Sequence, residues 1–289
     1  NGGSGAIGEY TTSGATVNAS LISGLNEPAG IAVEGVDLFV ANFNHGTSGS
    51  GSIGEYTTSG ATVSASLVSG LTSPEGLGVS GNDLFVTGGA IVSEFTTSGA
   101  TVNYKLINGL DNPASLVLEG TNMFEANSGT GTIGEYTTSG TPVNGSLVSG
   151  PGLNEPQGLA VEGTDLFVAN FGNGTIGEYT TSGATVNASL ISGLKGPVAV
   201  AVEGTDLFVA NYDNGTIGEY TTSGATVNAS LVSGLSDPLA LAIQPVPEPS
   251  MLALFGTGIG ALLLSAAAPN SIGNFLFRSG TVRPRHQNK

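Results

Sequence analysis

The amino-acid sequence predicts an all-β protein, a six-bladed β-propeller, on three observations. A segment of about 40 residues recurs along the chain, and each copy contains four short strand candidates. Glycine is abundant, at 47 of 289 residues, which suits short strands joined by tight turns. Only 10% of the residues are charged, and the repeated segments lack the 3.6-residue periodicity of a helical repeat.

Three short sequences define the repeat. IGEYTTSGATV begins, with small changes, at Ile7, Ile53, Val92, Ile133, Ile176 and Ile217. DLFVAN and its variants begin at Asp37, Asp83, Asn122, Asp165 and Asp206. EPAGIAVEG begins at Glu27 and has relatives near Pro74, Pro113, Pro156, Pro197 and Pro238.

Each repeat contains four expected strands, and the first complete one shows their order: GIAV (30–33), DLFVA (37–41), SIGEYT (52–57) and TVSASLVS (62–69). Turns rich in Gly, Asn, Asp and Ser separate the strands. The second and third strands alternate apolar and polar residues, which predicts that each is half-buried.

The strand count predicts how the ring closes. The first, third and fourth strands occur six times, but the second occurs only five times. The chain begins with a third and a fourth strand (7–22), and its repeats end on a first strand (239–243). A sixth blade would therefore combine both ends and lack only its second strand. Asn1 precedes Ile7 by six residues, the spacing that follows Val-Ala-Asn in three complete repeats. This predicts an N-terminally truncated propeller over 1–244; the alternative is a complete chain with one three-stranded blade.

The pattern PxGIAVEGxDLFVAN, followed by IGEY and Gly, resembles the NHL repeat over about residues 5–244. The resemblance implies a six-bladed propeller used as an interaction platform. It also implies distant enzyme relatives, the gluconolactonase-like and streptogramin-lyase-like propellers. The chain departs from the family where the repeat has Asp after Val-Ala, because it has Asn42, Asn127, Asn170 and Asn211 there.

The C-terminal part of the chain has a different composition. A short motif is followed by an uncharged run of 18 residues (251–268) and a basic tail (269–289). A helix of that length, about 27 Å, just crosses the ~30 Å core of a bilayer. The motif is Val246, Pro247, Glu248, Pro249 and Ser250.

This segment resembles a PEP-CTERM sorting signal. The resemblance implies an exported bacterial protein in which residues 245–268 hold the sorting motif and a single transmembrane helix (251–268). It also implies processing by an exosortase-type membrane enzyme and delivery to the cell surface or an exopolysaccharide matrix. Basic residues beyond the span place the tail inside the cell. The first arginine is Arg278, however, rather than directly after the span as in that family. A buried C-terminal helix is the alternative interpretation.

Charge and cysteine content exclude several functions. All 22 acidic residues lie at or before Glu248, and four of the six basic residues lie in the last twelve positions. A nucleic-acid partner is therefore excluded, since phosphate binding needs clustered Lys and Arg. The chain has no cysteine, so disulfides and thiolate chemistry are excluded as well.

The sequence predicts no catalytic residue and no cofactor. The two histidines, His45 and His286, lie in different segments, so a His-based triad or metal site is not expected. Glutamates recur at equivalent positions of the strands, whereas an active site needs unique residues in one place. Repeated carboxylates therefore indicate blade building or solvation.

An acidic rim is expected where the loops between blades emerge at one end of the channel. Oxygen ligands of this kind suit Ca²⁺, and the alternative is a role in solubility and turn formation. The rim residues are Glu27, Glu75, Asp111, Glu155 and Asp237.

The function predicted from these observations is that of a non-catalytic binding or structural propeller at the bacterial surface, with polysaccharide or a surface protein as partner. One alternative is a propeller enzyme of the lactonase or lyase type with a metal site in the central channel. Another is a near-functionless product of repeat expansion.

Overall fold

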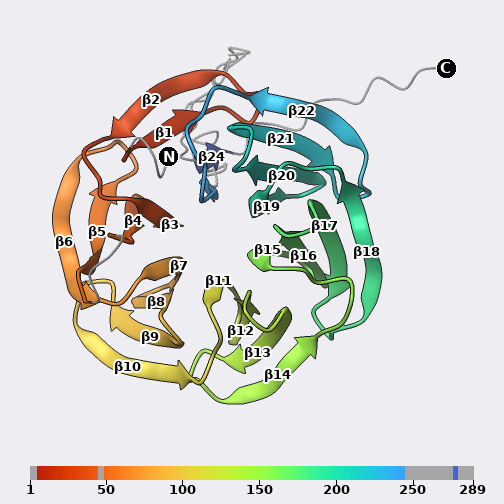
Figure 1. The fold of residues 1–289 in the computed structure, drawn as a ribbon. Helices are drawn as coiled ribbons and strands as arrows, with labels where there is room; N and C mark the ends of the chain where they lie inside the picture. Colours follow the sequence, from red (N-terminus) through yellow and green to blue (C-terminus); the bar gives the residue numbers. More distant parts are fainter. Residues whose placement is uncertain (1–4, 45–48, 245–275, 279–289) are drawn as a thin grey trace, which may run out of the picture.

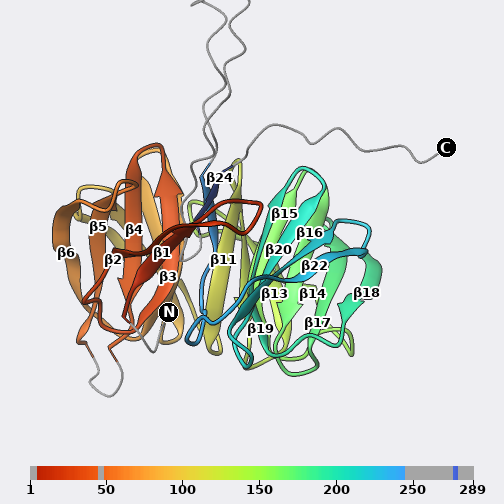
Figure 2. The ribbon, with the colours of Figure 1, turned by 90° about the horizontal axis from the view of Figure 1, so that it is seen from above.

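The computed structural model describes residues 5–44, 49–244 and 276–278 and forms a ring of β-sheets around a common axis (Figure 1). Each sheet is a radial blade whose first strand lies at the axis and whose fourth strand lies at the rim. Seen from the side, the ring is a short disc (Figure 2). The propeller fold predicted from the repeat is therefore confirmed.

Five blades each consist of four consecutive antiparallel strands. The first two are β3 (Pro28–Glu34), β4 (Asp37–Asn42), β5 (Gly51–Thr57) and β6 (Thr62–Leu71), then β7 (Pro74–Ser80), β8 (Asp83–Gly88), β9 (Ile91–Thr96) and β10 (Thr101–Asn108). The next two are β11 (Pro113–Glu119), β12 (Asn122–Asn127), β13 (Thr132–Thr137) and β14 (Pro142–Val148), then β15 (Pro156–Glu162), β16 (Asp165–Asn170), β17 (Thr175–Thr180) and β18 (Thr185–Ser192). The fifth is β19 (Pro197–Glu203), β20 (Asp206–Asn211), β21 (Thr216–Thr221) and β22 (Thr226–Val232).

The prediction of six blades is wrong, because the described residues form five regular blades. The remaining position in the ring holds a mixed sheet of both chain ends, in the order β2 (Thr16–Ile22), β1 (Ile7–Tyr10), β24 (Leu276–Arg278) and β23 (Ala242–Gln244). Strand β24 runs parallel to both of its neighbours. The physical reason is the composition of the chain ends: they supply a first, third and fourth strand but no DLFVAN segment to pair antiparallel between them.

The core consists of six apolar clusters, each between two neighbouring sheets. In β4, Leu38 and Val40 pack toward the mixed sheet, whereas Phe39 and Ala41 pack toward the second blade. The second strands are therefore buried on both faces, and the prediction that they are half-buried is wrong. A blade has neighbours on either side, so alternate residues of its middle strands face two cores rather than one core and solvent.

The third strand of most blades carries a glycine beneath a tyrosine ring. A Cβ added at Gly177 would lie 2.7 Å from a ring carbon of Tyr179, two residues further along β17. The second blade has Ser93 and Phe95 instead, and the Ser93 hydroxyl donates to the Tyr104 carbonyl oxygen. In the second blade, serine thus replaces the glycine and phenylalanine replaces the tyrosine that would cover it.

Candidate channel-mouth binding site

A cavity of about 510 Å³ opens at one end of the central axis. Its walls are the beginnings of the inner strands, each of which starts at or near a proline. In all six sheets, the residues one and three positions after that proline line the cavity. The side chain three positions after the proline is always a branched aliphatic one: Ile31, Leu77, Leu116, Leu159, Val200 and Leu241.

The position directly after the proline varies among the blades, whereas the third-strand sequence IGEYT is the same in four of the five regular blades. Because the residue at this position varies while the blades keep the same structure, packing within the blade does not determine which residue stands there. The six side chains at this position, in ring order, are Ala29, Glu75, Ala114, Gln157, Val198 and Leu239.

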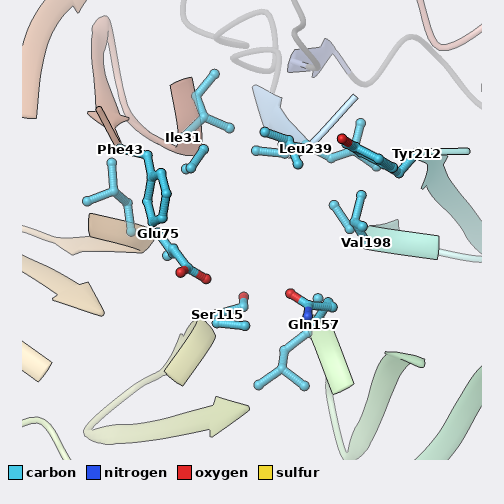
Figure 3. Close-up of a pocket in the computed structure, with 18 of the residues that line it drawn as sticks. Ile31, Phe43, Glu75, Ser115, Gln157, Val198, Tyr212 and Leu239 are labelled. Atoms are coloured by element: carbon cyan, nitrogen blue, oxygen red, sulfur yellow. The ribbon is translucent and has the colours of Figure 1, made fainter. Parts of the chain in front are cut away.

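The cavity has a polar side and an apolar side (Figure 3). Glu75, Ser115 and Gln157 lie together on one side, and the Glu75 carboxylate points toward the open centre. Val198 and Leu239 belong to the other side, which Tyr212 completes. Phe43 stands next to Glu75 at the boundary. The site therefore presents hydrogen-bonding groups opposite an aromatic and aliphatic wall.

The two aromatic rings are held in place by backbone hydrogen bonds between loops. The Phe43 N–H donates to the Glu27 carbonyl oxygen at 3.0 Å, and the Tyr212 N–H donates to the Gly196 carbonyl oxygen at 2.9 Å. Glu27 and Gly196 each precede a proline and adopt positive φ, 50° and 62°. The loops that join blades and those that follow the second strands thus meet on one face, as the sequence predicts.

The predicted acidic rim is only partly assembled. Glu27 and Asp237 line the cavity from the loops between blades. Glu75 lines it too, but from strand β7 rather than from a loop, because it follows Pro74 instead of preceding it. Asp111 and Glu155 do not belong to the lining of this cavity.

Burial sets the electrostatics of the polar side. It raises the pKa of Glu75 to about 7. Near neutral pH this carboxyl group is therefore present in both protonation states, and its neutral form both donates and accepts hydrogen bonds.

A second set of carboxylates lies at the far ends of the inner strands. Burial, together with the charges of Asp206 and Glu162, raises the pKa of Glu203 to about 7. The equivalent positions in two other sheets are neutral, Ser80 and Gln244. The Gln244 side-chain amide donates to the Gly35 carbonyl oxygen. The acidic ring at this end is therefore incomplete.

The predictions of a metal site and of a sorting signal concern residues of which the structure describes only some. Within residues 5–44, 49–244 and 276–278, no group of three or more His, Cys, Asp and Glu side chains is placed to hold a metal ion. In the same part of the chain, no helix has the length and apolarity needed to cross a bilayer. His45, His286, the motif Val246–Ser250 and the apolar run 251–268 lie outside the described residues.

The polar and aromatic lining residues Ser115, Gln157, Phe43 and Tyr212 were not predicted from the sequence. A usable signal was present, namely variation at one position of a nearly identical repeat. The acidic residues of the loops between blades predicted only the acidic rim.

Solved structures with the same fold include both enzymes and binding proteins. A streptogramin B lyase structure aligns with a TM-score of 0.62 and 19% identity, over 83% of this chain and 80% of that one. A nidogen/laminin complex aligns with a TM-score of 0.61 and 17% identity, over 71% and 80%. A gluconolactonase from Xanthomonas campestris aligns with a TM-score of 0.54 and 13% identity, over 69% and 74%. No family model and no curated protein matches the chain. These similarities establish the propeller fold.

Proposed function

We propose that this chain is a non-catalytic binding propeller whose ligand occupies the mouth of the central channel. The observation that carries the proposal is the variable position after each inner-strand proline. The third-strand sequence IGEYT is the same in four of the five regular blades, whereas this position contributes Glu75, Gln157 and Leu239 to one cavity. A concave site with an apolar wall and a few converging polar groups is the usual form of a small-molecule site.

The two-sided lining suggests an amphipathic ligand. Its apolar part would lie against Tyr212, Val198 and Leu239, and a hydrogen-bond donor would face Glu75 and Gln157. An uncharged or cationic group suits the cavity best, because its lining includes the acidic residues Glu27, Glu75 and Asp237.

The test uses the neutral probe N-phenyl-1-naphthylamine, whose fluorescence rises in apolar sites and whose amine can donate a hydrogen bond. Ala29→Phe places a ring in the mouth and should abolish the fluorescence rise. Val36→Phe makes a similar change at an exposed turn outside the cavity and should leave it intact. Equal signals from both variants would refute the channel mouth as the binding site.

We further propose that the protein is exported and anchored through residues 251–268 until an exosortase-type enzyme processes it, with surface polysaccharide or a surface protein as partner. The motif Val246–Ser250 ahead of an apolar run supports this proposal. Intact-mass measurement of native protein from cell-surface and medium fractions tests it. A C-terminus near Pro247–Ser250 is expected, and a tail extending to Lys289 in every fraction would oppose processing.

Glu75 supports a second candidate, a propeller enzyme. A carboxyl group with a pKa of about 7 is suited to act as a general base at neutral pH. Hydrolysis of simple lactones should then follow the ionisation of Glu75, and Glu75→Gln should abolish it. Binding of the fluorescent probe without lactone turnover would favour the non-catalytic role.

A further inference from the structure

The second blade contains a cavity of about 230 Å³ near the rim, separate from the channel mouth. The residues in which this blade differs from the other blades gather around it. Where other blades have Ala and Asn at the end of the second strand, this blade has Thr87 and Gly88. Where they have Gly in the third strand, it has Ser93, and its outer strand has Tyr104 and Lys105. All five residues line the cavity.

Replacement of asparagine by Gly88 removes a hydrogen-bond acceptor. In the third and fourth blades, the asparagine side chain accepts a hydrogen bond from a backbone N–H of the loop between blades, whereas the buried Oδ1 atoms of Asn42 and Asn211 in the first and fifth blades have no hydrogen-bond partner. The Asn127 Oδ1 accepts from the Asp111 N–H at 3.1 Å, and the Asn170 Oδ1 accepts from the Asn154 N–H at 3.3 Å. The equivalent N–H in the second blade belongs to Thr72, which lines the cavity. That N–H has no such side-chain acceptor.

The electrostatics of this cavity also differ from those of the channel mouth. None of the described residues that line it is acidic, whereas Glu27, Glu75 and Asp237 line the channel mouth. Lys105 and Lys195 are the only Lys or Arg residues before position 250, and of the two only Lys105 lines this cavity. One lysine and the Thr72 N–H thus belong to the lining of the same cavity.

The remaining walls are apolar and aromatic. Leu71, Val86 and Ile91 line the cavity together with the half-exposed ring of Tyr104. A ligand that fills this space needs an acceptor group for Thr72 and Lys105 and an apolar body for the rest.

We propose that this cavity is a second binding site, for a small carboxylic acid with an apolar or planar body. The carboxylate takes the place of the absent asparagine oxygen at the Thr72 N–H and pairs with the Lys105 ammonium group. The Tyr104 ring and the aliphatic side chains hold the body of the ligand. Charge-assisted hydrogen bonds of this kind are stronger than neutral ones.

Benzoate and the uncharged benzamide are suitable probes, titrated into the whole chain and followed by ligand-observed NMR. Benzoate should bind, and benzamide should bind about tenfold more weakly because it lacks the charge. Lys105→Met keeps the aliphatic stem and should weaken benzoate binding by a similar factor. Lys195→Met makes the same charge change outside the cavity and should leave the affinity unchanged.

Two results would overturn the proposal: no benzoate binding at any soluble concentration, or equal benzoate affinity in the Lys105→Met and Lys195→Met variants. Tyr104→Ala provides an independent check, since it removes the ring without altering charge and should also weaken binding. The channel-mouth variant Ala29→Phe should not affect benzoate binding. The proposal for this cavity can therefore be refuted independently of the proposal for the channel mouth.

Discussion

The turn at Gly14, near the start of the chain, lies directly against Leu231 in the outer strand of the fifth blade. A Cβ at Gly14 would lie 2.4 Å from the Leu231 carbonyl oxygen. The same contact recurs between each outer turn and the outer strand of the preceding blade, for example between Gly60 and Leu21 and between Gly224 and Leu190. The contact of Gly14 with Leu231 closes this chain of contacts into a ring.

Substitution of Gly14 should open the ring. Gly14→Ala is expected to lower the free energy of unfolding by about 3 kcal/mol, because it adds a clash to an unfavourable positive φ of 84°. Gly24 has a similar φ of 74° but no atom within 4 Å of its Cβ position, so Gly24→Ala should cost only about 1 kcal/mol. Urea unfolding of the two variants measures the difference. Equal losses would show that the ring contact does not contribute.

The Ser93 and Phe95 pair of the second blade predicts which substitutions the equivalent Gly177 and Tyr179 of the fourth blade tolerate together. Gly177→Ser should destabilise the fourth blade by about 2 kcal/mol, because Tyr179 covers the site. Tyr179→Phe should cost little, since the buried Tyr179 hydroxyl has no hydrogen-bond partner. The double variant reproduces the Ser93 and Phe95 pair, and its coupling energy should be favourable by about 1 kcal/mol. A double-mutant cycle from thermal unfolding tests this, and strict additivity would contradict it.

Glu125 should make stability depend on pH. It is fully buried where the other blades have Val, one carboxylate oxygen is unpartnered and the other accepts from the Asn127 side-chain amide. Burial raises its pKa from 4.5 to about 8, although the hydrogen bond from Asn127 opposes the shift. The folded state therefore holds a proton more tightly than the unfolded state, and stability falls as pH rises from about 4.5 to about 8.

Glu125→Val should remove most of this pH dependence and raise the free energy of unfolding at pH 8 by about 2 kcal/mol. Glu125→Gln is the matched control, since it cannot ionise but keeps the polar group buried. It should flatten the pH profile with a smaller gain in stability. An unchanged slope in both variants would assign the pH dependence to other groups.

The residue before each inner-strand proline should be a site of stored strain. Glu155 has a φ of 49°, whereas the equivalent residue of the fifth blade is Gly196. Glu155→Gly should therefore raise the free energy of unfolding by about 1 kcal/mol. Glu155→Ala removes the carboxylate without relieving the backbone and should not raise it. Thermal unfolding distinguishes a backbone effect from a charge effect.

The repeat predicted the strands because each strand is specified locally, by turn residues such as Gly35 and by apolar runs such as Leu38–Ala41. It did not predict the burial of both faces of that run, which depends on two neighbouring blades. The regular blade count failed for a related reason: the pairing of β23 with β24 joins distant segments, and no local pattern records it. Glu75 is predicted to lie in a loop, although the sequence already shows that it follows Pro74, whereas Glu27 and Glu155 precede their prolines. The sequence does not show that the residues after the six prolines line one cavity, because that depends on the closure of the ring.

The variable residue after each inner-strand proline has an evolutionary consequence. Duplication of a blade copies all that is needed for folding, since the clusters between blades repeat around the ring. Duplication also copies the residue after the inner-strand proline, which lines the channel and can change afterwards without disturbing the blade. New ligand preferences can therefore arise one blade at a time, without passing through unfolded intermediates. A library randomised only at Ala29, Glu75, Ala114, Gln157, Val198 and Leu239 should yield folded members with many different channels.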